Sequence, residues 1–286
     1  MSESSQILSS FPAKLYIIAT PIGNISDITY RAIETLRLVD IIAAEDTRHS
    51  GKLLHHYQIK KPMFALHDHN ERDRAKVLIE KIKGGLAIAL ISDAGTPLIS
   101  DPGYHLVNEC RAAGVDVVPI PGPSAVITAL SSAGLATDRF TFEGFLPAKE
   151  KGKQDKLKAL IEEKRTMVFY ESPRRIMDTV KQIILIFGGE RKLVIARELT
   201  KTFESFYSFP ASEMLTWLEQ DTNHCRGEFV LMVAGASLQE DRIPEDALNT
   251  LRLLKDQLPL KKAAALTAQI HQQKKNDLYK WGLENL

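Results

Sequence analysis

The sequence has few cysteines, no long apolar run and almost no excess of charge of either sign. Its two cysteines, Cys110 and Cys225, lie far apart and lack the spacing of metal ligands. We therefore expect neither a disulfide framework nor a cysteine zinc site. No apolar run approaches the ~20 residues that span a bilayer, and Met1–Ser10 lacks the basic start and apolar core of a signal peptide. A cytoplasmic protein without a membrane segment is expected.

The balance of charge and the missing motifs exclude several kinds of ligand site. Lys and Arg total 37 against 36 Asp and Glu, so any attraction to nucleic acid must come from local patches. The Gly-x-Gly-x-x-Gly dinucleotide turn and the Gly-Lys-Ser/Thr phosphate loop are both absent. No basic stretch is interleaved with aromatic residues, which argues against stacking of single-stranded bases. The 286 residues suffice for one large or two modest domains.

Short apolar runs alternate with helical repeats through the first half of the chain. Helical spacing is clear in Ile28, Ala32, Leu36 and Val39, and we expect Ser26 or Asp27 to cap that helix and Asn70 a later one. The expected strands are 15–19, 41–44, 63–66, 87–91 and 115–119. Such alternation predicts a parallel, doubly wound sheet whose strand-end loops share one edge.

The second half has fewer helices and more closely spaced strands, which predicts a mixed sheet. Pro173 is expected in the first turn of a helix. Lys149–Arg165 holds seven basic and four acidic residues. It is either a solvated helix face, which we favour, or a rim of the cleft that contacts the phosphates of a nucleic acid. The expected strands are 140–145, 167–170, 193–196, 202–209 and 228–234. We place the hinge between the two halves near Leu135–Asp138.

The last segment, Asp241–Leu286, reads as a separate helical unit similar to a helix-turn-helix. Between Pro259 and Gly282 it has five lysines and one acidic residue, and Asn276 is expected to cap its third helix. The predicted domains are therefore 13–135, a parallel α/β domain, 136–238, a mixed α/β domain, and 241–286, a basic helical unit.

Three strands of the first half end in loops rich in Gly and Pro: Pro21–Asn24, Ser92–Thr96 and Pro121–Ala125. Turn chemistry alone explains any single one of these loops. Three on one edge instead predict a ligand-binding crevice beyond the carboxyl ends of the strands. Gly95 would let backbone approach a ligand closely, as would Gly122, and Asp93 can accept hydrogen bonds from a hydroxyl pair or an amine.

These loops, with Asp101-Pro102-Gly103, resemble those of the tetrapyrrole methylase superfamily. Within it, Ala44–Arg48, Leu66–Glu71 and Ala196–Lys201 are similar to the ribosomal RNA small subunit methyltransferase I family. The resemblance runs from about Leu15 to the C-terminus. It implies two α/β domains with a cleft between them, S-adenosylmethionine as cofactor, and 2′-O-methylation of a cytidine ribose in 16S ribosomal RNA. It also implies a homodimer that acts on free RNA or on the assembled small subunit.

The resemblance also implies residues for the site. The methionine end of the cofactor would lie near Asp93–Gly95 and the adenosine against Gly122–Ala125. The expected cofactor-binding residues are Pro21, Gly23, Asp93, Ala94, Gly95, Thr96, Gly122, Ser124, Ala125, Tyr170, Ala196 and Gly227. The expected RNA contacts are Glu45, Arg48, His67, His69, Asn70, Arg174 and Arg197. No metal is expected, because strand alternation separates His67 from His69 and no third ligand is evident.

The identity of a general base stays open. A ribose hydroxyl is a weak acid, so a base within reach should speed the reaction. Candidates are Asp46, Glu171, Glu198, and Lys201 if burial depresses its pKa; Glu45 is a further possibility. The family usually has a histidine where this chain has Arg174. We prefer the Glu198/Lys201 pair, and alignment alone, with water as proton acceptor, is the alternative.

Two rival functions remain. A small-molecule methylase of the tetrapyrrole or precorrin type would share the cofactor loops but would need neither the Lys-rich segment nor the basic helical unit. A non-catalytic protein that senses a ligand and binds nucleic acid would bind both without turnover.

Overall fold

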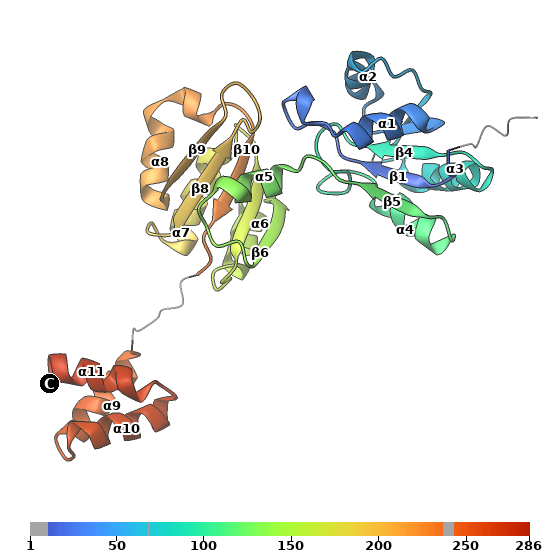
Figure 1. Ribbon diagram of the computed structural model, residues 1–286. Coiled ribbons are helices and arrows are strands. Elements are labelled where there is room, and N and C mark those ends of the chain that lie inside the picture. The colour runs from blue at the N-terminus through green and yellow to red at the C-terminus, as the bar shows by residue number, and fades with distance from the viewer. Residues whose placement is uncertain (1–10, 68, 237–242) are drawn as a thin grey trace, which may run out of the picture. The chain divides into compact units, whose positions relative to one another are not determined.

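The computed structural model describes residues 11–67, 69–236 and 243–286 (Figure 1). The chain divides into two compact units, Met1–Ala236 and Ser237–Leu286. The predicted boundary at 238–241 lies outside the described residues. Within the first unit the strands form two five-stranded sheets.

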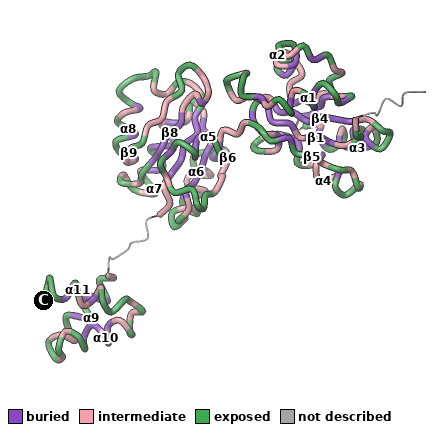
Figure 2. The backbone as a smooth tube through the Cα atoms, in the orientation of Figure 1, coloured by how far each residue is buried: buried purple, intermediate pink, exposed green. Residues whose placement is uncertain are grey.

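The first sheet is parallel throughout, as the alternation predicted. Its order is β3-β2-β4-β1-β5, and Leu15 pairs with Ile88 on one side and Val117 on the other. The strands are β1 (Leu15–Ile18), β2 (Ile41–Ala44), β3 (Met63–Ala65), β4 (Ile88–Ile91) and β5 (Val117–Ile120). One face packs against α1 (Tyr30–Leu38) and α2 (Thr47–His56), the other against α3 (Glu71–Lys83) and α4 (Tyr104–Ala112). The central strands β1, β2 and β4 are therefore largely buried, whereas the edge strands β3 and β5 are partly exposed (Figure 2).

Two of the predicted helix caps are wrong in detail. Thr29, rather than Ser26 or Asp27, caps α1 by accepting a hydrogen bond from the Ala32 N–H at 3.2 Å. The reason is an intervening 3₁₀ turn, η1 (Ile25–Asp27), whose own cap is Asn24. Asn70 does precede α3, but its side chain accepts from the His67 N–H instead of from the helix.

The second sheet is mixed, as predicted, with the order β6-β7-β10-β8-β9. Only β6 and β7 pair in parallel; the other neighbours are antiparallel. Its strands are β6 (Phe140–Phe145), β7 (Thr166–Glu171), β8 (Lys192–Arg197), β9 (Ser205–Pro210) and β10 (Phe229–Val233). One face packs against α6 (Glu150–Ala159), α7 (Ile176–Phe187) and α8 (Ala211–Gln220), and η2 (Thr222–Cys225) follows α8. Pro173 precedes α7 instead of opening it, because the chain turns through 172–175 first.

The opposite face of the second sheet is covered by α5 (Ala125–Ser132), although this helix follows the last strand of the first sheet. Val126, Ala129 and Leu130 pack against β7, β8 and β10. The chain thus reaches the second sheet before the predicted hinge at Leu135–Asp138. A boundary between two domains of this unit stays a prediction.

The described part of the C-terminal unit, residues 243–286, forms three helices: α9 (Glu245–Lys255), α10 (Leu260–His271) and α11 (Lys275–Asn285). Their small core includes Leu251, Ala264 and Leu278. Gln272, with a left-handed φ of 53°, makes the turn between α10 and α11 that a glycine often makes. Asn276 lies inside α11 and is not its cap, which is Lys274.

Candidate active site

A cavity of about 440 Å³ lies in the first unit, between the carboxyl edge of the parallel sheet and the α5-covered face of the mixed sheet. The loop after β4 and the start of α5 form one wall. The opposite wall is a row across three strands, because Val230 of β10 pairs with Tyr170 of β7 and with Ala196 of β8. The cavity therefore joins the loops that sequence reasoning placed on one edge to strands of the second half.

The cavity gathers most of the expected cofactor residues, and none of the expected RNA contacts lines it. Those that line it are Asp93, Ala94, Gly95, Thr96, Ser124, Ala125, Tyr170 and Ala196. Pro21, Gly23, Gly122 and Gly227 are not part of the lining. Of the proposed bases, only Glu171 lines it.

The glycines outside the lining allow close packing of the chain against itself. A Cβ on Gly122 would lie 2.9 Å from the Ala19 Cβ, and one on Gly23 would lie 2.6 Å from the Lys201 Cγ. A Cβ on Gly227 would overlap the Glu198 side chain at 2.6 Å. Close packing within the chain is therefore enough to explain why these positions are glycine, and no bound ligand is needed to explain it.

Gly95 differs, because it lines the cavity in a left-handed conformation with φ +77°. Its N–H and C=O both bond to Thr20, at 3.0 and 2.8 Å, in an isolated antiparallel bridge. The backbone of Gly95 is thus used to join two loops, and its conformation sets the shape of the wall.

Two loops at the cavity hold non-glycine residues in the left-handed region, which costs ~1–3 kcal/mol each where nothing compensates. These residues are Leu98 (φ 75°), Ser100 (φ 65°), Glu198 (φ 52°) and Thr200 (φ 65°). Each pair flanks a residue that lines the cavity, Ile99 in one loop and Leu199 in the other. Strain at such positions is typical of sites where precise placement matters.

Asp93 connects the cavity wall to the loop after β2. Its carboxylate accepts a hydrogen bond from the Asp46 N–H at 3.2 Å. Asp46 in turn caps α2, accepting from the N–H groups of Arg48 and His49 at 2.8 and 3.3 Å. The bond from the Arg48 N–H holds the pKa of Asp46 below its usual value. The Asp46 carboxylate thus serves as a helix cap and does not line the cavity; its role as a base stays a prediction.

The preferred pair, Glu198 and Lys201, forms an ion network with Glu228. The Lys201 ammonium lies 2.9 Å from Glu198 and 3.0 Å from Glu228, and Glu198 also accepts the Glu228 N–H at 2.8 Å. Burial works to lower the pKa of Lys201, but its bonds to both carboxylates raise it above its ordinary value. The depressed pKa that a lysine base requires is therefore contradicted. Only Glu228 of these three lines the cavity.

Burial likewise works to raise the pKa of Glu198, but the Glu228 N–H and the Lys201 ammonium bring it below its ordinary value. A carboxylate held in this way is a weak proton acceptor. Both members of the pair are better suited to fixing the loop, an interpretation supported by the bond from the Asn24 N–H to the Thr200 hydroxyl at 3.0 Å.

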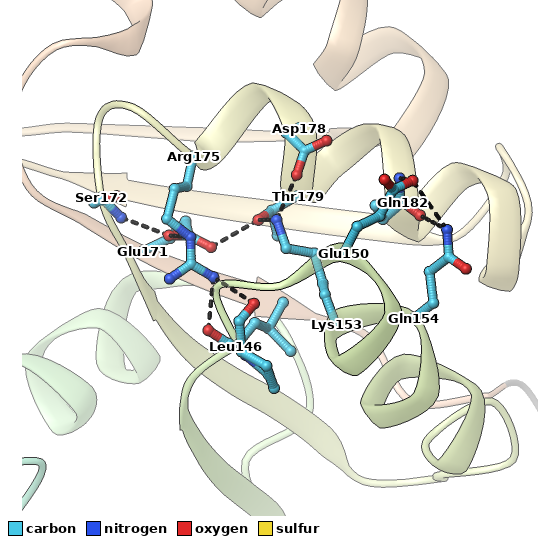
Figure 3. Close-up of polar contacts among 11 residues, drawn as sticks. Leu146, Glu150, Lys153, Gln154, Glu171, Ser172, Arg175, Asp178, Thr179 and Gln182 are labelled. Carbon is cyan, nitrogen blue, oxygen red and sulfur yellow. Dashed lines mark hydrogen bonds and ion pairs between the residues drawn. The ribbon is translucent and has the colours of Figure 1, made fainter.

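Glu171 is buried, and both of its carboxylate oxygens accept hydrogen bonds (Figure 3). One oxygen accepts the Ser172 N–H at 2.8 Å and faces the Arg175 guanidinium at 3.4 Å; the other accepts the Thr179 hydroxyl at 2.7 Å. Thr179 also contacts the ammonium of Lys153, a residue of α6 that is only 2% exposed and pairs with Asp178. A polar chain thus runs from the cavity wall into the helical layer, and it orients Glu171.

The predicted RNA contacts lie outside the cavity lining. Arg197 donates to the Arg226 carbonyl, and the His67 imidazole bonds the Asn70 amide at 2.8 Å. The rings of His67 and His69 lie 6.1 Å apart. Among the described residues, no group of three or more His, Cys, Asp or Glu could hold a metal ion. Arg174 is exposed.

Several lining residues escaped the sequence reasoning. They are Ile22, Ile99, Ser100, Asp101, Phe145, Ser172, Pro173, Leu199, Glu228, Phe229 and Val230. Asp101 follows directly from the motif already singled out, but Phe229 and Val230 become neighbours of the site only through strand pairing. Burial raises the pKa of Tyr170 to about 12, helped by the charge of Asp101, so its phenol stays protonated.

The charge of the lining has one sign. Four carboxylates contribute to it, those of Asp93, Asp101, Glu171 and Glu228, and the described lining residues include no Lys, Arg or His. The remaining surface is largely apolar. An acidic, partly apolar cavity favours a ligand with a positive centre and an apolar body.

A parallel and a mixed sheet with the cavity at the strand ends define a methylase of the tetrapyrrole type. The family model for Tetrapyrrole (Corrin/Porphyrin) Methylases matches residues 14–215, and that for the RsmI C-terminal HTH domain matches 241–286. The solved uroporphyrin-III-C-methyltransferase of Thermus thermophilus aligns with 78% of this chain and 94% of its own, with a TM-score of 0.55. At 17% identity this likeness shows the fold alone.

Much more similar sequences narrow the assignment. The Ribosomal RNA small subunit methyltransferase I of Vibrio cholerae is 60% identical over 273 residues, 95% of each chain. The protein of the same name from Escherichia coli O157:H7 is 58% identical over 271 residues, again 95% of each. The chain belongs to the ribosomal RNA small subunit methyltransferase I family, which confirms the predicted family and fold.

Proposed function

We propose that this protein transfers a methyl group from S-adenosylmethionine to the 2′-hydroxyl of a cytidine ribose in 16S ribosomal RNA. The observation that carries the proposal is the acidic cavity at the strand ends, in a chain whose relatives are named ribosomal RNA methyltransferases. The finer choices, cytidine and ribose, come from the resemblance to the family.

The cavity fits the cofactor in size and in charge. Its ~440 Å³ lies within the ~300–1,000 Å³ usual for small-molecule sites. Asp93 to Thr96 would hold the methionine end, and Ser124, Ala125 and Ala196 the adenosine. When bound, the cofactor supplies a methyl group already activated by a sulfonium. The carboxylates of Asp93 and Asp101 favour that positive charge.

The residues of the chain then have two tasks: to align the ribose with the cavity and to accept a proton. Alignment is supported by the two strained loops and by the buried bonds that fix Glu171. For the proton we propose Glu228, which lines the cavity and whose side chain is 79% exposed. Like Glu198, it contacts Lys201, at 3.0 Å, but Glu198 also accepts a backbone N–H and does not line the cavity.

Methyl transfer with labelled cofactor tests the function against its rivals. The protein should label unmodified small ribosomal subunits or their RNA, and the label should be found on a cytidine ribose after nucleoside digestion. Transfer to a free porphyrinoid would support the tetrapyrrole methylase instead. Binding of cofactor and RNA without any transfer would support the ligand-sensing protein.

The setting of the reaction is also a proposal. Ribosomal RNA as substrate supports a cytoplasmic protein, and we expect a homodimer from the family resemblance. No helix among the described residues is both long and apolar enough to span a membrane. Comparing free RNA with assembled subunits in the same assay identifies the form of the substrate.

A further inference from the structure

The segment from Thr47 to His67 is basic and contains no acidic residue. It holds four of the chain's Lys and Arg residues and four of its eight histidines. In a chain with almost equal numbers of acidic and basic residues, 21 consecutive positions without a carboxylate form a strong local bias. The segment spans α2, the loop after it and β3.

Helical spacing places the basic side chains and histidines of α2 on one face of the helix. Arg48, His49, Lys52, His55 and His56 follow the i, i+1, i+4, i+7, i+8 pattern of a single helix face, and all five are exposed. The opposite face packs against the parallel sheet and contains the buried Leu54. We call these five residues, with Lys60 and Lys61, the α2 surface.

The end of this surface is hollowed. A groove of about 240 Å³ is lined by His55, Lys60 and Lys61, together with Gly51 and Met63. Gln58, with φ 55°, turns the chain so that both lysines return toward the helix. Among the described residues no ion pair involves Lys52, Lys60 or Lys61, so no carboxylate of the described chain neutralises them.

The α2 surface begins beside the cavity. Asp46 caps α2, and its N–H donates to Asp93, which lines the cavity. A polymer whose reacting unit enters the cavity would therefore pass over α2 on that side. The charge complementarity fits a phosphate backbone, since Lys and Arg bind phosphates and imidazoles can donate to their oxygens.

The Lys-rich segment around α6, the other basic stretch of this unit, is less available. Lys153 is buried against Asp178, Lys156 pairs with Glu143, and Arg165 pairs with Glu163. Nearly half of its seven basic residues thus serve internal contacts, which supports the solvated helix face predicted for it. A solvated face is the ordinary explanation for α2 as well. However, α2 itself contains no acidic residue, only Arg48 of its surface has an ion pair among the described residues, with the cap Asp46 at 3.6 Å, and the helix adjoins the cavity.

We infer that the α2 surface binds the phosphate backbone of the RNA that flanks the reacting nucleotide. The inference rests on the proposed function, which supplies RNA as the substrate. Phosphate contacts position the RNA and carry no sequence information, so the surface should hold flanking nucleotides of any sequence.

The test compares two variants of the full chain, each lacking three lysines. Lys52→Gln/Lys60→Gln/Lys61→Gln removes lysines of the α2 surface. The control, Lys76→Gln/Lys81→Gln/Lys83→Gln, removes three lysines of α3. This helix packs against the same parallel sheet, and its basic residues alternate with acidic ones. RNA affinity is measured from 50 to 200 mM salt, with 16S ribosomal RNA and with a random single strand. Calorimetry with S-adenosylmethionine and thermal unfolding verify that both variants are intact.

Each phosphate contact contributes ~0.7 to the slope of log affinity against log salt for single strands. The α2 variant should therefore flatten the slope by ~2 for both RNAs, and the control should leave it unchanged. Lys52→Gln alone should flatten it by ~0.7, which keeps the test valid if the triple variant unfolds. An unchanged slope, or equal flattening by the control, overturns the inference. Wild-type protein that binds RNA with the expected slope but transfers no methyl group would refute the proposed function and leave the surface standing.

Discussion

Removing one partner of the ion pair between Lys153 and Asp178 should change the free energy of unfolding by very different amounts, depending on which partner is removed. The Lys153 side chain is 2% exposed, whereas that of Asp178 is 58% exposed. Replacing Asp178 by Asn removes the ion pair of the buried ammonium. Its remaining contact is the Thr179 hydroxyl, 3.3 Å away, which connects it only indirectly to the Glu171 carboxylate. Replacing Lys153 by Met keeps most of the volume, removes the buried charge and leaves a carboxylate that water can reach (Figure 3).

The two free-energy changes can be bounded from this geometry. Removing the counter-charge of a buried ion costs ~3–5 kcal/mol, and the exposed position of Asp178 puts this case near ~3 kcal/mol. Lys153→Met should cost ~0–1 kcal/mol, because apolar replacement of buried charges is often nearly neutral. For a unit of this size ~3 kcal/mol lowers the melting temperature by ~6–12 °C.

Thermal unfolding of the full chain, followed by near-ultraviolet circular dichroism, measures both variants. Asp178→Asn should melt well below wild type, Lys153→Met close to it, and the double variant should match Lys153→Met alone. Equal losses from the two single variants, or a larger loss from Lys153→Met, would refute the idea that the buried ammonium dominates this pair.

Three further outcomes are expected. Gly95→Ala should weaken cofactor binding in calorimetry, because φ +77° is costly for alanine and the new Cβ would lie 3.3 Å from the Ile22 Cγ2; unchanged affinity would remove this loop from the site. Lys201→Met should destabilise the protein at pH 7 but less at pH 3.5. In the folded protein the pKa of Glu198 lies below its unfolded value of ~4.3, so the ionised Glu198 stabilises the fold above that pH, and this stabilisation is lost as the pH falls. A urea-unfolding difference that is the same at both pH values would contradict this. Cys110 is buried and its pKa is raised to about 11, so a thiol reagent at pH 8 should modify it only after unfolding, and rapid labelling of native protein would show the burial to be wrong.

The fold followed from the sequence because its elements are set locally. Buried parallel strands such as Ile88–Ile91 read as continuous apolar runs, and Gly84 ends the helix before them. The cap of α1 could not be predicted as easily, since Ser26, Asp27 and Thr29 are all good caps and only the 3₁₀ turn at 25–27 decides among them.

The site was predictable only where it follows strand ends. Asp93 to Thr96 could be located from the β4 pattern, whereas the contribution of Val230 depends on the antiparallel register of β10. The condition set for Lys201, a pKa depressed by burial, could not be judged from the sequence because a pKa reports three-dimensional neighbours. Two carboxylates, one of them 27 residues away in sequence, outweigh its burial. Such long-range partners leave no mark in a local pattern.

The most direct test of the central claim is a nucleoside analysis of 16S ribosomal RNA. RNA from cells lacking the gene for this protein should have lost a methyl group from the ribose of a cytidine, and the wild-type gene should restore it. An unchanged nucleoside profile, or the loss of a methyl group from a base instead of a ribose, would contradict the account.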